Sequence, residues 1–224
     1  MALLILARHA QASFGAANYD ELSDLGRQQA RWLGEHLRTR NLTLHSVHAG
    51  SLVRQQDTAR EVLQAMGMSH LPVATDPGFN EYHAEPLVRA HLGITNVREL
   101  QKTDYKKYWR LFREAMQAWA ADELANVPET WTQFGERMHR AMRKATEGAD
   151  RDDVVLVVSS GGAISRGIAD LLQAPPATAI ELNMQLRNTA FCELIVGQRA
   201  IRLVSFNAMP HLDTAERRDR ITAA

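Results

Sequence analysis

The residues best suited to do chemistry in this chain each follow a short apolar run. Arg8 and His9 follow the first run, Arg54 comes shortly after a second, and Ser159-Ser160-Gly161-Gly162 follows the strongest run of all. Arginine binds phosphate oxygens through two parallel N–H donors, and the free N–H groups at the start of a helix favour an anion. Together these residue types predict a phosphate-binding pocket.

His9 adds reactivity to that pocket. A neutral imidazole nitrogen is a competent nucleophile toward phosphorus, and transfer to it divides one difficult hydrolysis into two easier displacements. The leaving oxygen then needs a proton, and a nearby carboxylic acid can donate it. Glu81 and Glu85 are both candidates for this donor, because both lie in a stretch that we expect to be a loop over the site.

The apolar patterning predicts the elements that position these residues. We expect strands over 3–6, 46–49, 71–74 and 154–158, and helices over 23–40, 51–67, 104–125, 130–148 and 163–172. Residues 189–196 and 199–206 read as an antiparallel hairpin with Gly197-Gln198 in a type II′ turn. Residues 76–103 look irregular, and the polar tail from about Asp213 looks frayed.

Strands that alternate with helices predict an α/β fold, here a three-layer α/β/α sandwich. Its sheet is expected to be mainly parallel, with an antiparallel edge hairpin. Since no repeat or linker divides the sequence, we expect a single domain over 1–224, with 76–126 as an inserted helical cap. In such sheets ligands bind at the carboxyl ends of the strands, where Arg8, His9 and the Ser159–Gly162 turn are expected.

Composition excludes several classes of function. The chain has 26 Lys plus Arg and 26 Asp plus Glu, so it lacks the basic excess that binds nucleic acid. Its single cysteine, Cys192, cannot form an internal disulfide, and no segment reads as a signal peptide or a membrane span. We therefore expect a cytoplasmic protein without nucleic-acid or membrane partners; a homodimer through the edge hairpin is left open.

The ordered motifs resemble the histidine phosphatase superfamily, which contains the cofactor-dependent phosphoglycerate mutases and many phosphatases. The resemblance rests on Arg8-His9, on Ser51-Leu52-Val53-Arg54 followed by Asp57-Thr58-Ala59, on Asn80-Glu81-Tyr82-His83, and on a strand leading to Ser-x-Gly-Gly. It implies His9 as the phosphorylated nucleophile and Glu81 as the proton donor. It also implies a phosphate clamp of Arg8 and Arg54. From the free N–H groups at the helix start we further predict that Ser160 and Gly161 bind the phosphate.

Three positions depart from the family pattern. Ala10 stands where the first motif usually has glycine, Gly15 where many mutases have asparagine, and Ser160 where the family has a second histidine. Loss of that imidazole removes a charge-assisted hydrogen bond worth about 2–4 kcal/mol to the transferring group. His83 or His211 could supply a substitute imidazole.

The remaining candidates are weaker. His83 and Asn188 could contact substrate, although a turn-forming Asn188 is an equal alternative. An aromatic stripe within 104–125 is interpreted as core packing. His45 and His48 have metal-like spacing but no nearby carboxylate or cysteine, so we expect no metal, and no nucleotide-binding motif implies a cofactor.

These observations favour a phosphomonoesterase that acts on a small phosphorylated metabolite through a phosphohistidine intermediate. One alternative is a phosphoglycerate mutase, which the missing histidine and Gly15 disfavour. Another is a catalytically weak or inactive protein that binds phosphate esters in the same pocket, an alternative that Ala10 and Ser160 motivate.

Overall fold

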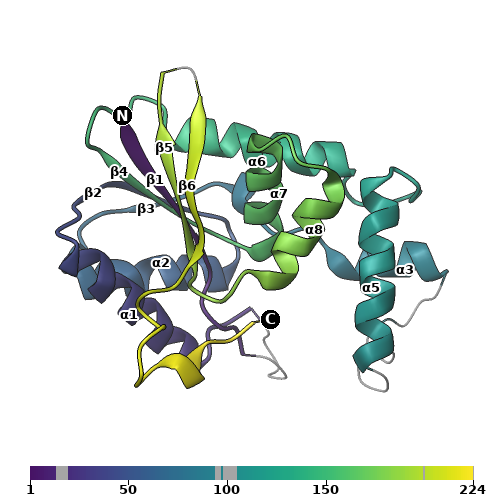
Figure 1. Ribbon diagram of the computed structural model, residues 1–224, viewed down its shortest axis with the longest axis horizontal. Coiled ribbons are helices and arrows are strands. Elements are labelled where there is room, and N and C mark those ends of the chain that lie inside the picture. Colours follow the sequence, from purple (N-terminus) through teal and green to yellow (C-terminus); the bar gives the residue numbers. More distant parts are fainter. Residues whose placement is uncertain (14–19, 94–96, 98–104, 199, 224) are drawn as a thin grey trace.

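A six-stranded sheet forms the centre of the molecule in the computed structural model, which describes residues 1–13, 20–93, 97, 105–198 and 200–223. The strand order is β3-β2-β4-β1-β5-β6 (Figure 1). The strands are β1 (Ala2–Arg8), β2 (Leu44–Ala49), β3 (Val73–Thr75), β4 (Val154–Ser159), β5 (Phe191–Val196) and β6 (Ile201–Ala208). The first four are parallel, and β5 and β6 are antiparallel, which confirms the expected α/β sheet with an antiparallel edge hairpin.

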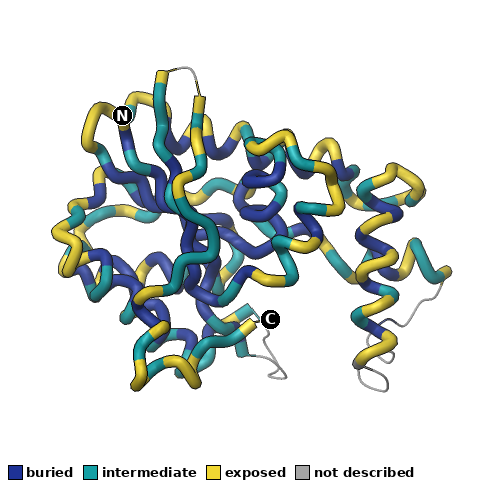
Figure 2. Tube along the Cα trace, viewed as in Figure 1, coloured by how far each residue is buried: buried dark blue, intermediate teal, exposed yellow. Residues whose placement is uncertain are grey.

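The apolar runs of β1 and β4 are continuous because helices cover both faces of the sheet. Ile5 and Leu156 pack toward α1 (Asp24–Thr39) and α2 (Val53–Met66), while their neighbours in sequence pack against the opposite helices. That opposite layer contains α6 (Trp131–Ala145), α7 (Gly161–Leu171) and α8 (Pro176–Gln185). The sheet interior is therefore the most deeply buried part of the chain (Figure 2).

Local sequence signals set several helix ends as expected. Ser23 caps α1 by accepting a hydrogen bond from the Gly26 N–H, and Thr130 forms a reciprocal capping box with Gln133 at α6. Gly67 ends α2 in the left-handed region, at φ 73°. No helix among the described residues is long and apolar enough to cross a bilayer.

The segment expected to be irregular contains two helical elements. A short 3₁₀ helix, η1 (Pro77–Phe79), is followed by α3 (Ala84–Leu92), which packs on α5 (Tyr105–Ala120). Pro86 in the first turn of α3 and Gly93 just after its end, at φ 64°, are helix signals that the irregular interpretation overlooked. Residues 94–96 and 98–104 of the segment lie outside the described residues.

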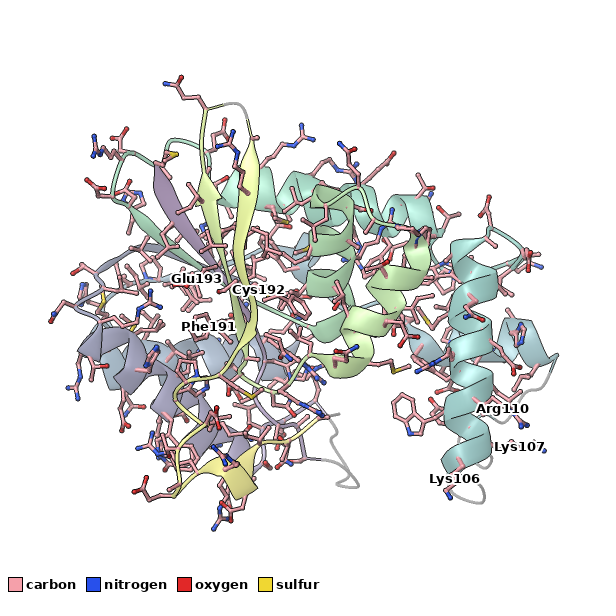
Figure 3. All side chains as sticks on the ribbon, viewed as in Figure 1. Lys106, Lys107, Arg110, Phe191, Cys192 and Glu193 are labelled. Carbon is pink, nitrogen blue, oxygen red and sulfur yellow. The ribbon has the colours of Figure 1, made fainter. Side chains whose placement is uncertain are left out.

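Helix α5 lies at one end of the molecule, and Lys106, Lys107 and Arg110 are in its first two turns (Figure 3). It ends at Ala120, before the expected boundary near 125. Phe112 and Trp119 are buried in the core, which confirms packing as the role of these members of the aromatic stripe. The division into one domain with a cap over 76–126 stays a prediction.

The C-terminal third departs from expectation in three places. Helix α8 was not expected, although its Pro176 is at a favoured first position. Val196 pairs with Ile201, the Gly197 N–H donates to the Ala200 carbonyl at 3.0 Å, and Gly197 lacks the positive φ that a type II′ turn requires. The tail is not frayed: it forms η2 (Arg218–Arg220), and the Arg220 carbonyl accepts a hydrogen bond from Gln29 Nε2 at 2.8 Å.

Candidate active site

The hydrogen bonds of His9 decide which ring nitrogen is reactive. Nδ1 lies 2.8 Å from the Ala10 carbonyl oxygen, and since a carbonyl can only accept, Nδ1 carries the proton. Nε2 then has the lone pair, and it accepts a hydrogen bond from Arg54 Nε at 3.2 Å. Burial, reinforced by the charges of Arg54 and Arg8, holds the pKa of His9 well below its ordinary 6.5. The ring is therefore neutral at physiological pH, with Nε2 as its nucleophilic atom.

The backbone around His9 is fixed by three other elements. The His9 N–H donates to the Ser159 carbonyl of β4 at 2.8 Å, and the His9 carbonyl accepts from Asn188 Nδ2 at 3.1 Å. The next N–H, that of Ala10, donates to Thr58 Oγ1 of α2 at 3.0 Å. Ala10 is buried and has no positive φ, so this backbone accommodates an alanine without strain.

Two guanidinium groups flank the ring. Arg54, in the first turn of α2, bonds Asp20 Oδ1 through Nη1 at 2.6 Å, and Asp20 Oδ2 accepts from the Val53 N–H at 2.8 Å. Arg8, at the end of β1, is 5 % exposed and donates from Nη1 to the Leu186 carbonyl. These cations beside a nucleophilic nitrogen suit the transfer of a phosphoryl group, whose charge they would neutralise.

Glu81 is placed against the start of α7. Its Oε2 accepts from the Gly162 N–H at 2.9 Å and its Oε1 from the Tyr82 N–H at 3.2 Å. A Cβ at Gly162 would collide with the Glu81 carboxylate and the Tyr82 ring, so only glycine allows this approach. Burial raises the pKa of Glu81 above its ordinary value, against the lowering effects of the Gly162 hydrogen bond and of Arg54. A raised pKa suits a proton donor.

The structure distinguishes the two acidic candidates. Glu81 has both Arg54 and Arg8 close enough to influence its pKa. Glu85 is exposed in the first turn of α3. The geometry therefore favours Glu81 as the acid.

Gly161 starts α7 beside Arg8, and a Cβ built there would lie 3.6 Å from Arg8 Nε. Ser160, which precedes it, is fully buried, and its Oγ accepts a hydrogen bond from Gln55 Nε2 at 2.8 Å. The same Gln55 nitrogen donates to the Phe79 carbonyl at 3.0 Å. At position 160, where the resemblance led us to expect a second histidine, this chain thus has a serine bonded to a buried glutamine.

The other histidine candidates lie elsewhere. His83 is exposed at the N-cap of α3. His211 is buried and bonds Thr189 Oγ1 through Nε2 at 2.9 Å, and burial lowers its pKa to about 3. Gln55 is the side chain bonded to the Ser160 hydroxyl, so the structure gives no support to a substitute imidazole there. Gly15 lies outside the described residues.

Asn188 is a supporting residue in this geometry. It is 2 % exposed, holds the His9 carbonyl, and exchanges hydrogen bonds with Thr222 in the tail. Its neighbour Arg187 donates its backbone N–H to Asn207 Oδ1 at 3.0 Å.

Other potentially reactive groups do not compete with His9. Cys192 is buried on β5 within the sheet, and burial raises the pKa of its thiol to about 12 (Figure 3). Within the described part of the chain, no three His, Cys, Asp or Glu side chains are arranged to hold a metal ion.

Sequence reasoning overlooked several residues that shape the site. Gln55 is buried on α2, whereas the apolar Val53 of the same helix is 41 % exposed. Asn183 of α8 also reaches the site, where its Nδ2 donates to the Tyr82 hydroxyl at 3.2 Å. Asp20 follows a stretch with no regular pattern, so its partnership with Arg54 had no local signal.

The chain belongs to the histidine phosphatase superfamily (branch 1), whose model matches residues 4–209. Among curated proteins it is 31 % identical, over 85 residues, to a 2,3-bisphosphoglycerate-dependent phosphoglycerate mutase of Methylobacterium sp. (strain 4-46); this covers 35 % of the chain and 41 % of the mutase. A Bartonella quintana protein of the same name is 30 % identical over 113 residues, 48 % of the chain and 54 % of that protein. The chain thus spans about half the length of the curated relatives it matches.

Solved structures share the fold over almost the whole chain. A mutant of phosphoserine phosphatase from Entamoeba histolytica, in complex with phosphoserine, aligns over 95 % of this chain and 100 % of its own, with a TM-score of 0.67 and 19 % identity. A mycobacterial glucosyl-3-phosphoglycerate phosphatase aligns over 92 % and 99 %, with a TM-score of 0.65 and 24 % identity.

Proposed function

We propose that this chain is a phosphomonoesterase that hydrolyses a small phosphorylated metabolite through a phosphohistidine at His9. The observation that carries the proposal is the hydrogen bond between His9 Nδ1 and the Ala10 carbonyl, because it leaves Nε2 unprotonated. Membership of the histidine phosphatase superfamily supports the same chemistry.

The reaction consists of two displacements. His9 Nε2 attacks phosphorus, the bond from phosphorus to the ester oxygen breaks, and Glu81 gives its proton to the leaving alcohol. Water then attacks the phosphohistidine, the N–P bond breaks, and the Glu81 carboxylate takes a proton from that water. Arg8, Arg54 and the N–H groups at the start of α7 stabilise the charge on the transferring group in both steps.

The test compares phosphate release from aryl and alkyl phosphates by the wild type and by His9→Ala. The proposal predicts that His9→Ala abolishes release while the purified variant stays folded. Equal rates for the two proteins would assign the activity to a contaminant and leave the alternative of a phosphate-ester-binding protein.

A phosphoglycerate mutase is the second candidate, because the curated relatives carry that name. A mutase must keep the phosphoryl group on its histidine and exclude water while the intermediate reorients. An assay with 3-phosphoglycerate, with and without 2,3-bisphosphoglycerate, separates the two functions. Isomerisation faster than phosphate release would replace the phosphatase proposal by the mutase.

A further inference from the structure

The three carbonyl groups that precede Glu81 all accept hydrogen bonds from side chains of other elements. Arg137 Nη1, from α6, donates to the Gly78 carbonyl at 2.9 Å and to the Asn80 carbonyl at 2.8 Å. The Phe79 carbonyl between them accepts from Gln55 Nε2 at 3.0 Å and Ser159 Oγ at 2.7 Å. The backbone that delivers Glu81 is therefore held from α6, α2 and β4 at once.

Arg137 uses its whole guanidinium group in this arrangement. Nε and Nη2 bond the two carboxylate oxygens of Glu129 at 2.6 and 3.0 Å, and Cζ lies 4.6 Å from the centre of the Phe134 ring. Glu129 balances the charge and sets the plane of the fork, which directs Nη1 toward the two carbonyls. A lysine has one nitrogen and cannot make both the paired contact with Glu129 and the two carbonyl contacts.

The segment is also packed closely against α6. A Cβ added at Gly78 would lie 2.6 Å from the Ala141 Cβ and 3.1 Å from the Arg137 carbonyl oxygen. Gly78 itself forms part of η1, whose start is capped by Asp76 through the Gly78 N–H at 2.8 Å. Because of this close approach, the segment has little room to shift along α6. The hydrogen bonds of Arg137 therefore hold it in one position on that helix.

A displacement of the Gly78–Asn80 backbone would also displace Glu81, which follows it directly in the chain. The Glu81 carboxyl bridges from the segment to the Gly162 N–H at the start of α7. Proton donation needs the donor within hydrogen-bond distance of the leaving oxygen, and a displacement of about 1 Å can cost about 10²-fold in rate.

We propose that Arg137 is a positioning residue for the proton donor Glu81, acting through the carbonyl groups of Gly78 and Asn80. This inference rests on the proposed phosphatase function and on Glu81 as its acid. It predicts a defect specific to protonation of the leaving group, which a residue that only stabilises the fold would not produce.

The experiment measures kcat/KM for 4-nitrophenyl phosphate and phenyl phosphate with each protein. The first leaving group needs little help from an acid, whereas the second depends on it. We compare the wild type with Glu81→Gln, Arg137→Met, Arg137→Lys and, as a matched control, Arg140→Met. Arg140 is on the same helix, is 70 % exposed and pairs only with Glu136 among the contacts of the described residues. The ratio of the two rates is independent of the fraction of protein that is folded.

We expect Glu81→Gln to raise the ratio in favour of 4-nitrophenyl phosphate by about 10²-fold and Arg137→Met to raise it by about tenfold. Arg137→Lys should raise it less, and Arg140→Met should leave it within a factor of about two. If Arg137→Met lowers both rates equally while Glu81→Gln changes the ratio, Arg137 is structural and the inference is wrong. If Glu81→Gln leaves the ratio unchanged, the assignment of Glu81 in the proposed function fails first.

Discussion

His9 and Arg54 are coupled at the scale of single residues. In the structure the lone pair of His9 Nε2 accepts a hydrogen bond from Arg54 Nε, so Arg54 orients the ring and, after burial, is the second cause that lowers the pKa of His9. Asp20 fixes the other end of the guanidinium. The planar fork is what allows one side chain to reach both partners.

Replacing Arg54 by lysine tests this coupling. Arg54→Lys keeps the positive charge but cannot contact His9, Asp20 and a phosphoryl oxygen together, so kcat/KM should fall by roughly 10²-fold. Steady-state assay of aryl phosphate hydrolysis measures it. Arg60→Lys, on the exposed side of the same helix, is the control and should change little. A rate for Arg54→Lys within a factor of about two of wild type would contradict a role in phosphate binding.

Ser160 leads to a second prediction at this scale. Because the Ser160 hydroxyl is buried against Gln55, an imidazole at position 160 has to displace that amide. Ser160→His should therefore lower the free energy of unfolding by about 1–3 kcal/mol and should not raise activity. Adding Gln55→Ala makes room for the imidazole, so the double variant should recover part of the lost free energy of unfolding. Denaturant unfolding and kcat/KM measure the outcome, and a single variant that is more active and equally stable would refute it.

The sequence was informative about site residues that follow strands. Arg8, His9 and Gly161 are at the ends of β1 and β4, and parallel pairing of Arg8 with Ser159 brings them together, as the apolar runs predicted. Gln55 and Asp20 could not be found in that way, because their importance depends on contacts with residues 105 and 34 positions away.

The same distinction applies to the elements: those set by neighbouring residues were predictable from the sequence, and those that depend on distant contacts were not. The capping box of α6 and the left-handed Gly67 were readable from neighbouring residues alone. The tail was misread as frayed because its order depends on two buried side chains far away in the sequence. Gln29 donates to Thr222 Oγ1 at 3.0 Å, and Thr222 Oγ1 donates to Asn188 Oδ1 at 2.9 Å.

The tail therefore supports the loop that contains His9. Gln29 accepts from the Gln11 N–H at 3.0 Å, and Asn188 donates to the His9 carbonyl. Thr222 is hydrogen-bonded to both Gln29 and Asn188, so it supports the two side chains that hold this loop. Thr222→Val removes both hydrogen bonds of its hydroxyl and should cost about 1–3 kcal/mol of stability, with a fall in kcat/KM. Thr39→Val, at an exposed hydroxyl bonded within α1, is the control for denaturant unfolding. Equal effects of the two substitutions would contradict support of the site by the tail.

At the scale of the whole molecule, several histidines have lowered pKa values. Burial is the first cause for His9, His36, His48 and His211, the last with a pKa of about 3. As the pH falls through about 6.5, the unfolded chain binds more protons at these histidines than the native state does, so the free energy of unfolding decreases as the pH decreases. Glu81 has the opposite sign, since its raised pKa favours the native state at low pH.

His211 allows a direct measurement of this effect. It contributes a loss of about 1.4 kcal/mol for each pH unit below 6.5, continuing toward its native pKa of about 3. His211→Phe should be less stable than the wild type at pH 8, because the substitution removes the hydrogen bond to Thr189. Between pH 6.5 and 5, however, its free energy of unfolding should fall less steeply than that of the wild type. Urea titrations at several pH values give both slopes; parallel slopes would show that His211 binds a proton in the native state.

The central claim is that His9 forms a covalent bond to phosphorus, and the most direct measurement is to trap that bond. Rapid quenching during turnover of a phosphomonoester with a labelled phosphoryl group, followed by peptide mapping, locates the label. We predict an acid-labile, base-stable phosphoryl group on the peptide containing His9, and none in His9→Ala. Label on another residue, or no label in an active preparation quenched within a turnover, would contradict the mechanism.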